Sequence, residues 1–566
     1  MREQPPPAVR SSRVRRLCRW SRRSAHPGLE LAHTATRELQ CHSLIYGGVC
    51  VSLHTAVSRF LIVVILSALV AAQTAEQKTA RYLDSIRKQP PLLLAFLHDI
   101  PKGGDLHSHL GGAVYAEDLI DFAASDNLCV DRTTSQLIAP PCDSCEKYTS
   151  KPSIRCAYGD HILYNQIIDA WSMRNWRPGD ESGHDHFFAT FDKYGLATHD
   201  HAAELVATII DRAAREHVQY IEFMHTADGG AALELGMKLG GDADFAKMRE
   251  QLLAGGLKEI AAATSQTLAE DEAKVQKELK CGTPDAEPGC NVTVRYLYQV
   301  LRGLPRAAVF AQIVLGFELA STDPHFVGLN LVMPEDWYVP IHDFNEHMAM
   351  LDYLHSVYPK VHITLHAGEL AMGLVKPEDL SFHIRASVER GHAERIGHGV
   401  SVMDEKDATG LLMELAQRNV LVEINLTSND SILGVSGEDH PLPVYVKYGV
   451  PVALSTDDEG VSRSDMTHEY LRAVESYGLS YANLKRMARQ SLEHSFLPGE
   501  SLWAQTKIQF RAVTSCAEIT EKPSSQCDRF LAKSERAREQ WKLEGAFRDF
   551  EKQYRSVPLA QLGKTR

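Results

Sequence analysis

Short apolar runs rich in β-branched residues alternate with longer segments of helical periodicity from about residue 100 to residue 500. This alternation is typical of parallel α/β folds, in which each buried strand is followed by a helix that packs on the sheet. Eight runs are predicted as strands: the segment ending at Leu106, Val218–Met224, Val292–Val300, Ile313–Phe317, His362–Leu365, Arg395–Gly397, Val420–Ile424 and Val452–Leu454. They predict an α/β fold of the TIM-type (β/α)8 barrel class, whose active sites lie at the carboxyl ends of the strands.

Two segments depart from this pattern. Residues 126–182 combine four cysteines with several prolines and little periodicity, so we expect a disulfide-held insertion after the first strand and its helix. From about residue 516, aromatic residues stand among charges, which predicts a C-terminal helical tail docked on the barrel. The expected division is an N-terminal extension with signal peptide at 1–72, a helical lead-in at 73–98, the barrel at 99–515 and the tail at 516–566.

Charge is distributed unevenly along the chain. Residues 1–72 carry +7, from ten arginines and three glutamates, so the remainder carries −20 against a total of −13. A surface this acidic repels polyanions, and we therefore expect no nucleic-acid partner.

The apolar run Phe60–Val70 follows an arginine and ends in the small residues Ala71 and Ala72. It is too short to span a bilayer, and its charged, apolar and small parts predict a secretory signal cleaved after Ala72. Because such signals begin near the natural start, Val51 and Val57 are alternative starts, and a signal-anchor helix is the alternative structure. We expect a secreted or periplasmic protein with no stable membrane insertion after cleavage.

Cysteine usage agrees with export. Eight cysteines follow Ala72 in three local groups: Cys129, Cys142, Cys145, Cys156, Cys281, Cys290, Cys516 and Cys527. An even number in local groups is typical of disulfides formed in an oxidising compartment. The separations favour Cys281 with Cys290 and Cys516 with Cys527, and the pairing of the first four stays open.

Four predicted strands end in residues that bind metals or transfer protons. The first leads into His107-Ser108-His109, and side chains at i and i+2 point to the same side of a strand. The fifth, sixth and eighth end in His366-Ala367-Gly368-Glu369, Gly397-His398-Gly399 and Ser455-Thr456-Asp457-Asp458. A barrel brings these ends together at one mouth.

We predict that His107, His109, His366 and Asp457 hold one Zn²⁺ per chain. Three imidazole nitrogens and one carboxylate oxygen leave a position for water, which distinguishes a catalytic zinc from a structural one. Taken singly, each residue is more often a buried histidine or a helix-capping aspartate, so the prediction depends on their joint position at strand ends.

Two other metal sites are weighed. Binuclear amidohydrolases bridge their metals with a lysine on the fourth strand, and the run Ile313–Phe317 holds none, which favours one metal. Pro141–Cys145 matches the PCxxC of cytidine deaminases, but its HxE counterpart, His392–Glu394, comes later in the chain instead of earlier. Disulfides are the preferred interpretation of these cysteines.

The HxH, HAGE, GHG and STDDEG strings resemble the active site of the adenosine deaminase family, over about Lys102 to His468. Export and the insertion resemble the secreted adenosine deaminase growth factors, although the chain is more similar to a bacterial counterpart. By this resemblance and by chemistry, Glu369 is the proton shuttle and His398 the base or electrostatic partner of the attacking water. Asp458 would accept a hydrogen bond from substrate.

Further substrate contacts follow from the resemblance. Phe187, Phe188 and Phe191 form an FFxxF pattern similar to the family's helix over the nucleoside, with core packing as the alternative. Ser321 stands where the family has a glycine that offers its backbone to the purine. Gly111 stands where nucleoside-specific relatives have an acid for the ribose, so deamination is better supported than adenosine as substrate.

The sequence therefore predicts a zinc-dependent hydrolytic deaminase of a 6-aminopurine nucleoside, converting adenosine to inosine and ammonia. A deaminase of free adenine or an N6-substituted purine is the alternative on the same site. A non-catalytic binding or signalling protein on this barrel is disfavoured, because all seven expected catalytic positions hold competent residues. The expected partner is a small-molecule purine nucleoside, and oligomerisation is left open.

Overall fold

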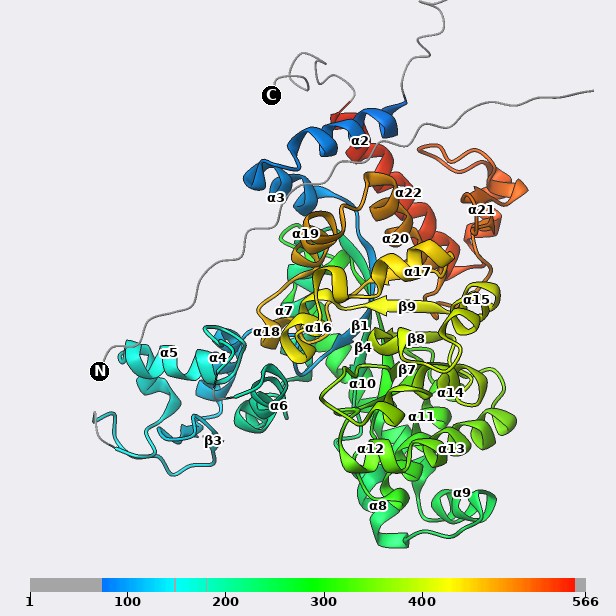
Figure 1. Ribbon diagram of the computed structural model, residues 1–566. Coiled ribbons are helices and arrows are strands. Elements are labelled where there is room, and N and C mark those ends of the chain that lie inside the picture. The colour runs from blue at the N-terminus through cyan, green and yellow to red at the C-terminus, as the bar shows by residue number, and fades with distance from the viewer. Residues whose placement is uncertain (1–73, 147–148, 180, 555–566) are drawn as a thin grey trace, which may run out of the picture. The chain divides into compact units, whose positions relative to one another are not determined.

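Eight parallel strands form the centre of the protein. The computed structural model describes residues 74–146, 149–179 and 181–554. The strands follow one another around the sheet as β1 (Gly103–His109), β4 (Val218–His225), β5 (Thr293–Leu301), β6 (Phe326–Val332), β7 (His362–Ala367), β8 (Arg395–His398), β9 (Leu421–Ile424) and β10 (Val452–Leu454). Every neighbouring pair is parallel. A parallel bridge between Ser108 and Asp457 closes the circle, so the predicted TIM-type barrel is confirmed (Figure 1).

Helices connect the strands. The α-helices are α2 (Ala75–Ile86), α3 (Pro90–Asp99), α4 (Ala116–Ser125), α5 (His161–Ala170), α6 (Gly183–Tyr194), α7 (Ala202–Arg215), α8 (Ala231–Leu239), α9 (Phe245–Ala254), α10 (Leu257–Glu278), α11 (Arg306–Thr322), α12 (Tyr338–His342), α13 (Phe344–Val357), α14 (His383–Glu389), α15 (Ala408–Arg418), α16 (Leu426–Leu433), α17 (Leu442–Tyr448), α18 (Glu459–Ser462), α19 (Met466–Tyr477), α20 (Tyr481–Glu493), α21 (Ser525–Leu531) and α22 (Glu535–Gln553). Short 3₁₀ helices lie at Ile154–Tyr158, Gly195–Ala197, Pro288–Asn291, Pro377–Leu380, Val400–Met403, Gly437–Asp439 and Thr514–Cys516. Two small antiparallel hairpins pair β2 (Cys129–Val130) with β3 (Leu137–Ile138) and β11 (Trp503–Gln505) with β12 (Arg511–Ala512).

The prediction of a strand at Ile313–Phe317 is wrong. These residues lie in α11, in which every residue from Ala308 to Leu319 is buried. A helix buried on all sides lacks the 3.6-residue alternation of apolar and polar positions, so a short piece of it resembles a buried strand. The fourth strand of the barrel is β6, which likewise contains no lysine. The other seven predicted segments each overlap a barrel strand.

Four disulfides tie local segments together. In the segment between α4 and α6 the pairs are Cys129–Cys142 and Cys145–Cys156, which the sequence left open. The predicted pairs Cys281–Cys290 and Cys516–Cys527 are confirmed. Each bridge joins residues 9 to 13 positions apart, so the disulfides stabilise individual loops instead of linking distant parts of the fold.

The last described helix, α22, packs against the barrel's outer helices. Phe550 is buried between the rings of Tyr481 and Phe96, with centroids 6.3 and 5.2 Å away. The Glu551 carboxylate accepts a 2.6 Å hydrogen bond from Lys485 Nζ on α20. Apolar burial together with a shielded ion pair therefore holds this helix in place.

The predicted signal at Phe60–Val70 and its cleavage point after Ala72 lie outside the described residues. Within the described ranges, no helix combines the length and apolar character needed to cross a membrane.

Candidate metal centre and active site

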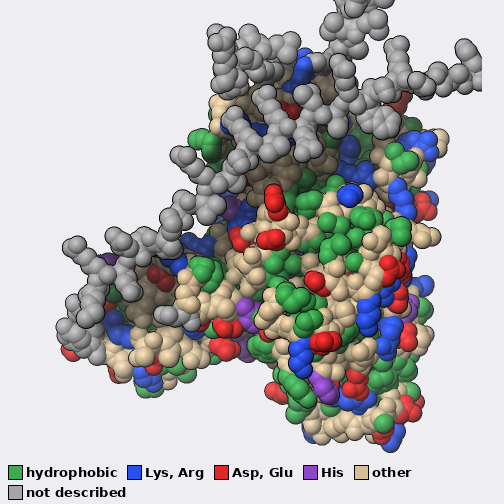
Figure 2. All heavy atoms as spheres, in the orientation of Figure 1, with side chains coloured by type: hydrophobic (Ala, Val, Ile, Leu, Met, Phe, Trp, Pro, Cys, Tyr) green, Lys and Arg blue, Asp and Glu red, His purple; other side chains and the backbone are tan. Residues whose placement is uncertain are grey.

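Buried polar side chains, more than surface charge, mark the functional region. On the face shown in Figure 2, acidic and basic side chains are interspersed with apolar ones. At the carboxyl end of the barrel, by contrast, His107, His366, His398, Asp457 and Glu369 are all buried. Burying so many polar groups costs free energy unless they bond to one another or to a ligand, so this cluster calls for a functional explanation.

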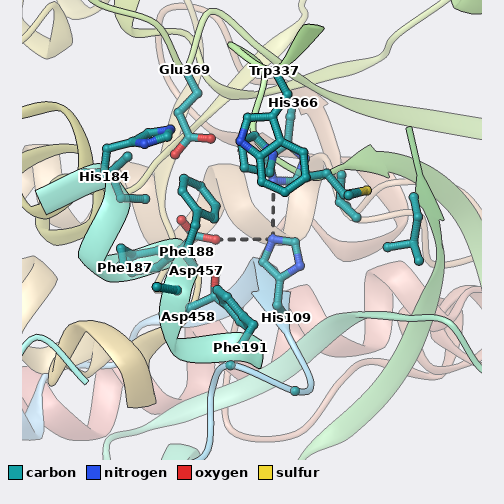
Figure 3. Close-up of a pocket in the computed structure, with 18 of the residues that line it drawn as sticks. His109, His184, Phe187, Phe188, Phe191, Trp337, His366, Glu369, Asp457 and Asp458 are labelled. Carbon is teal, nitrogen blue, oxygen red and sulfur yellow. Dashed lines mark hydrogen bonds and ion pairs between the residues drawn. The ribbon is translucent and has the colours of Figure 1, made fainter. Parts of the chain in front are cut away.

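Asp457 lies between the two histidines of β1. Its N–H donates to the His107 carbonyl at 2.8 Å and its carbonyl accepts from the His109 N–H at 3.3 Å, and these two bonds close the barrel. Its Oδ1 lies 3.4 Å from His107 Nε2 and 3.3 Å from His109 Nε2. His366, on β7, places its Nε2 3.2 Å from that of His109 (Figure 3). Barrel closure thus brings the four predicted ligands close together. Within the described residues, His107, His366, His398 and Asp457 form one group that could hold a metal ion, and His109, Asp457 and Asp458 form another.

The three histidines bond through Nδ1 to different acceptors. His107 Nδ1–H donates to Glu423 at 2.7 Å, and His109 Nδ1–H donates to Gln299 at 2.9 Å. His366 Nδ1–H donates to the Asn330 side-chain oxygen at 3.0 Å. Burial lowers the pKa of His107, but Asp457 and Glu423 outweigh it and raise the pKa to about 10, so Nε2 of the metal-free ring carries a proton whose place a metal ion would take.

This donor set fits a divalent metal ion. Within the described residues, His107 Nε2 is buried without a hydrogen-bond partner, as expected for an atom that bonds to a cation. His109 Nε2 and His366 Nε2 lie 3.2 Å apart, close enough to share one proton in the metal-free protein or to bind one cation. Three histidines and one carboxylate form a set that Zn²⁺ accepts, with a coordination position left for water.

His398, also close to Asp457, differs from these ligands. A chain of hydrogen bonds sets its proton: the Leu442 N–H donates to His440 Nδ1, His440 Nε2–H donates to Asn429 Oδ1, and the Asn429 amide donates to His398 Nδ1. The His398 proton therefore sits on Nε2, 3.8 Å from Asp457 Oδ2. Burial lowers the pKa of His398 to about 3, which keeps the ring neutral. His398 is thus arranged to donate a hydrogen bond from Nε2, and it also lies within 4.8 Å of ligand atoms of His107, His366 and Asp457 in a group that could hold a metal ion.

Glu369 is arranged to carry a proton. It is buried, and its Oε1 lies 3.6 Å from His398 Nδ1. Burial raises the pKa of Glu369 well above its ordinary value, and the neighbouring carboxylates of Asp457 and Glu335 raise it further. A carboxyl group that stays protonated near neutral pH can act as a general acid.

Glu335, in the loop after β6, holds the Glu369 segment in place. Its carboxylate accepts the backbone N–H groups of Gly368 at 3.0 Å and Glu369 at 2.8 Å, and it also pairs with His383. Burial raises the pKa of Glu335, but His383 and Arg302 outweigh it and lower the pKa to about 2. A fixed negative charge therefore holds the backbone of Glu369 in place. No sequence motif pointed to Glu335, because it follows β6, the strand that the sequence analysis placed at Ile313–Phe317.

A buried ion-pair network supports His107 from inside the barrel. Glu423 on β9 accepts from His107 with one oxygen and, at 2.6 Å, from Arg395 Nε with the other. Arg395 also pairs with Glu222 on β4 at 2.5 Å. All these charges are paired and hydrogen-bonded, which is the condition for burying them without a large penalty.

A cavity of about 500 Å³ opens beside the candidate metal centre. Helix α6 contributes Phe187, Phe188 and Phe191 to its lining, and Trp337 lies opposite (Figure 3). Asp458 also lines it, with a buried Oδ1 that has no hydrogen-bond partner among the described residues. The cavity thus offers aromatic faces and an unused acceptor, as expected for a flat, polar-edged ligand.

Ser321 does not belong to the cavity, and its prediction as a substrate contact is wrong. It lies exposed on α11, where its hydroxyl donates to the Phe317 carbonyl at 2.7 Å. The residue that follows the fourth strand is Met333, whose φ of +84° is unusual for a residue with a side chain. Met333, unlike Ser321, lines the cavity.

Two glycines shape the cavity beside His109. A Cβ at Gly112 would lie 1.7 Å from Asp458 Oδ1, so only glycine allows this close approach. A Cβ at Gly111 would meet nothing within 4 Å. Gly111 therefore leaves open space where the nucleoside-specific pattern has an acidic side chain.

Comparisons with known proteins agree with these strand-end motifs. The family model described as adenosine deaminase matches residues 168–504. Adenosine deaminase of Salmonella heidelberg is 40% identical over 149 residues, 26% of this chain and 41% of that protein. The Escherichia coli (strain SE11) enzyme is 38% identical over 140 residues, 25% and 39% of the two chains. The chain thus spans about two fifths of the length of these relatives.

Solved structures with similar folds were also found. An N6-mAMP deaminase of Arabidopsis is 21% identical with a TM-score of 0.45, covering 71% of this chain and 95% of that one. An adenine deaminase of Arthrobacter aurescens is 16% identical with a TM-score of 0.45, covering 70% and 94%. Because the family model covers more than half of the 566 residues, the chain belongs to the adenosine deaminase family.

Proposed function

We propose that the protein is a zinc-dependent hydrolytic deaminase that converts adenosine to inosine and ammonia. The observation that carries this proposal is the convergence of three histidines and the Asp457 carboxylate beside a cavity that Glu369 also lines. A nucleophile site and an acid on one cavity wall are what hydrolysis of a C–N bond requires.

His107, His109, His366 and Asp457 would hold a single Zn²⁺. When bound, zinc lowers the pKa of a coordinated water to about 7 and so supplies a nucleophile at neutral pH. No lysine lies on β6 to bridge a second metal. The fixed Nδ1 acceptors Glu423, Gln299 and Asn330 would keep the histidines aimed at this ion.

Three further residues would act on substrate and water. Glu369 would deliver its proton to N1 of the purine, which makes C6 more electrophilic. His398 would orient the attacking water through Nε2–H, since its Nδ1 already accepts from Asn429. Asp458 would accept a hydrogen bond from the purine with its unused buried oxygen.

The cavity lining favours an uncharged substrate. Phe187 and Phe191 would face the nucleoside, while Asp185 and Asp192 add negative charge near the opening. Among the described residues that line the cavity, none is lysine or arginine. A phosphate group would find no lysine or arginine there, so nucleosides are favoured over nucleotides.

Deamination of free adenine or an N6-substituted purine is the second candidate. It is favoured by the open space at Gly111, which removes one expected sugar contact. We also propose that the protein acts outside the cytosol, because all eight cysteines after Ala72 are paired in local disulfides.

A substrate screen tests the proposal. Ammonia release is measured with adenosine, 2′-deoxyadenosine, adenine, an N6-methylated purine nucleoside and adenosine 5′-monophosphate at equal concentration. The proposal expects the highest kcat/KM for adenosine or its deoxy form and the lowest for the monophosphate. The highest kcat/KM for adenine would support the second candidate, and no ammonia from any 6-aminopurine would overturn both.

A further inference from the structure

Helix α6, whose aromatic residues cover the cavity, is fastened to the barrel at its first turn. His184 Nε2 lies 2.9 Å from Asp336 Oδ1, and its Nδ1 lies 3.0 Å from Asp185 Oδ1. The side chains of His184 and Asp336 are only 10% and 16% exposed. Such a shielded pair is screened by solvent much less than an exposed one.

The two partners come from distant parts of the chain. His184 lies on α6, which precedes β4, and Asp336 lies in the loop between β6 and α12. The His184 ring packs edge-on against Phe188, with centroids 4.9 Å apart. The pair therefore ties α6 to a barrel loop. Figure 3 shows His184 on the helix that carries Phe187 and Phe188.

The loop that carries Asp336 also lines the cavity and contacts the Glu369 segment. Met333 and Trp337 line it directly, and Glu335 holds the backbone of Glu369. Asp336 stands between Glu335 and Trp337. The contact between α6 and Asp336 thus fixes the position of the aromatic helix relative to the segment that carries Glu369.

The other side of the α6 amino end is fixed by close packing. A Cβ at Gly183 would lie 2.0 Å from the Ser431 carbonyl oxygen on α16, so the two helices touch there. His184 is the next residue, and its ion pair supplies the anchor on the barrel-loop side. Burial lowers the pKa of His184, but Asp336 and Asp185 outweigh it and raise the pKa above its ordinary value, which favours the charged ring.

We infer that His184 and Asp336 form a clasp that holds α6 over the cavity, which makes His184 a positioning residue for substrate binding. This inference rests on the proposed function for its kinetic consequence only. The clasp acts on α6 and not on the reacting atoms, so it contributes to binding substrate and transition state alike. Its loss raises KM and leaves kcat nearly unchanged.

The test compares His184→Ala, Asp336→Ala and the double variant with His199→Ala. His199 lies five residues beyond α6, is 72% exposed, pairs with its neighbour Asp200 at 2.9 Å and does not line the cavity. In the substrate-free protein, amide hydrogen exchange across 183–194 should be faster in the clasp variants and unchanged in His199→Ala. For adenosine, KM should rise about tenfold with kcat within about twofold, the loss of one charge-assisted hydrogen bond.

Two further results decide the assignment. The double variant should be no worse than either single one, since the residues act as a pair, and His184→Gln should recover part of the KM because its amide can still donate to Asp336. An amide exchange rate across 183–194 in His184→Ala equal to that of the wild type would overturn the clasp. So would a rise in KM in the double variant that equals the sum of the two single effects in free energy. If the wild-type protein released no ammonia, the proposed function would fail, and the exchange comparison would still test the clasp.

Discussion

At the scale of single residues, the arrangement of acceptors around the three histidines explains why their Nε2 atoms converge. Glu423, Gln299 and Asn330 lie on β9, β5 and β6, so three different strands orient three ligands from β1 and β7. Preorganised ligands lose little freedom on binding a metal, and removal of a ligand should therefore affect metal content directly.

His366→Ala should lose both metal and activity. The substitution leaves at most three protein ligands and removes the nitrogen 3.2 Å from His109 Nε2. Metal analysis of the purified variant should give much less than one zinc per chain, whereas His392→Ala, a surface histidine paired with Asp352, should retain the wild-type content. Full zinc content in His366→Ala would remove His366 from the ligand set.

Glu369→Gln separates chemistry from binding at one position. The amide is nearly isosteric but cannot deliver a proton, and general acid catalysis is typically worth about 10² to 10⁴-fold. We expect kcat to fall by at least this range while KM and zinc content change little. Glu378→Gln, an exposed residue of the same connection, is the control. A near-normal kcat in Glu369→Gln would rule out the proton-shuttle role.

The catalytic candidates could be predicted from the sequence because they stand in short strings at strand ends. Their supporting residues could not. Glu423 and Gln299 lie inside ordinary strand sequences and meet the histidines only when the barrel closes. Ser321 was misplaced for a related reason, since its position depended on a strand that is a helix. Short sequence motifs are enough to predict candidate ligands. The residues that orient these ligands come from distant strands, and they become apparent only when the strands pair in the barrel.

At the scale of elements, the extent to which a helix is buried explains whether its sequence pattern identifies it as a helix. The helix α7 buries Leu205, Val206, Ile209 and Ile210 on one stripe, which gives a clear helical period. Helix α11 is buried on every side and gives none. The aromatic tail was predictable because its large apolar residues recur with helical spacing among charges.

Phe550→Ala should weaken the docking of α22. The ring is buried against Phe96 and Tyr481, and truncating a buried phenylalanine costs about 3 to 5 kcal/mol. Urea unfolding should show this loss in the free energy of unfolding, while Asp549→Ala, its exposed neighbour, should change it by less than about 0.5 kcal/mol. Equal stability of the two variants would show that α22 does not contribute to the fold.

At the scale of the whole molecule, the four local disulfides relate to where the protein works. The mature chain should begin near Gln73, and thiol titration of the denatured, unreduced protein should find close to zero free thiols. Cys18, Cys41 and Cys50 would be removed with the leader. Eight free thiols, or a mature chain that begins before residue 60, would contradict export.

A deaminase that uses one zinc ion can be tested by titrating metal-stripped protein with Zn²⁺ and measuring ammonia release from adenosine at each step. We expect the rate to rise linearly with added zinc and to level off at one ion per chain, because one set of four ligands would hold it. Full activity in the metal-free protein, or a rate that keeps rising to two ions per chain, would contradict it.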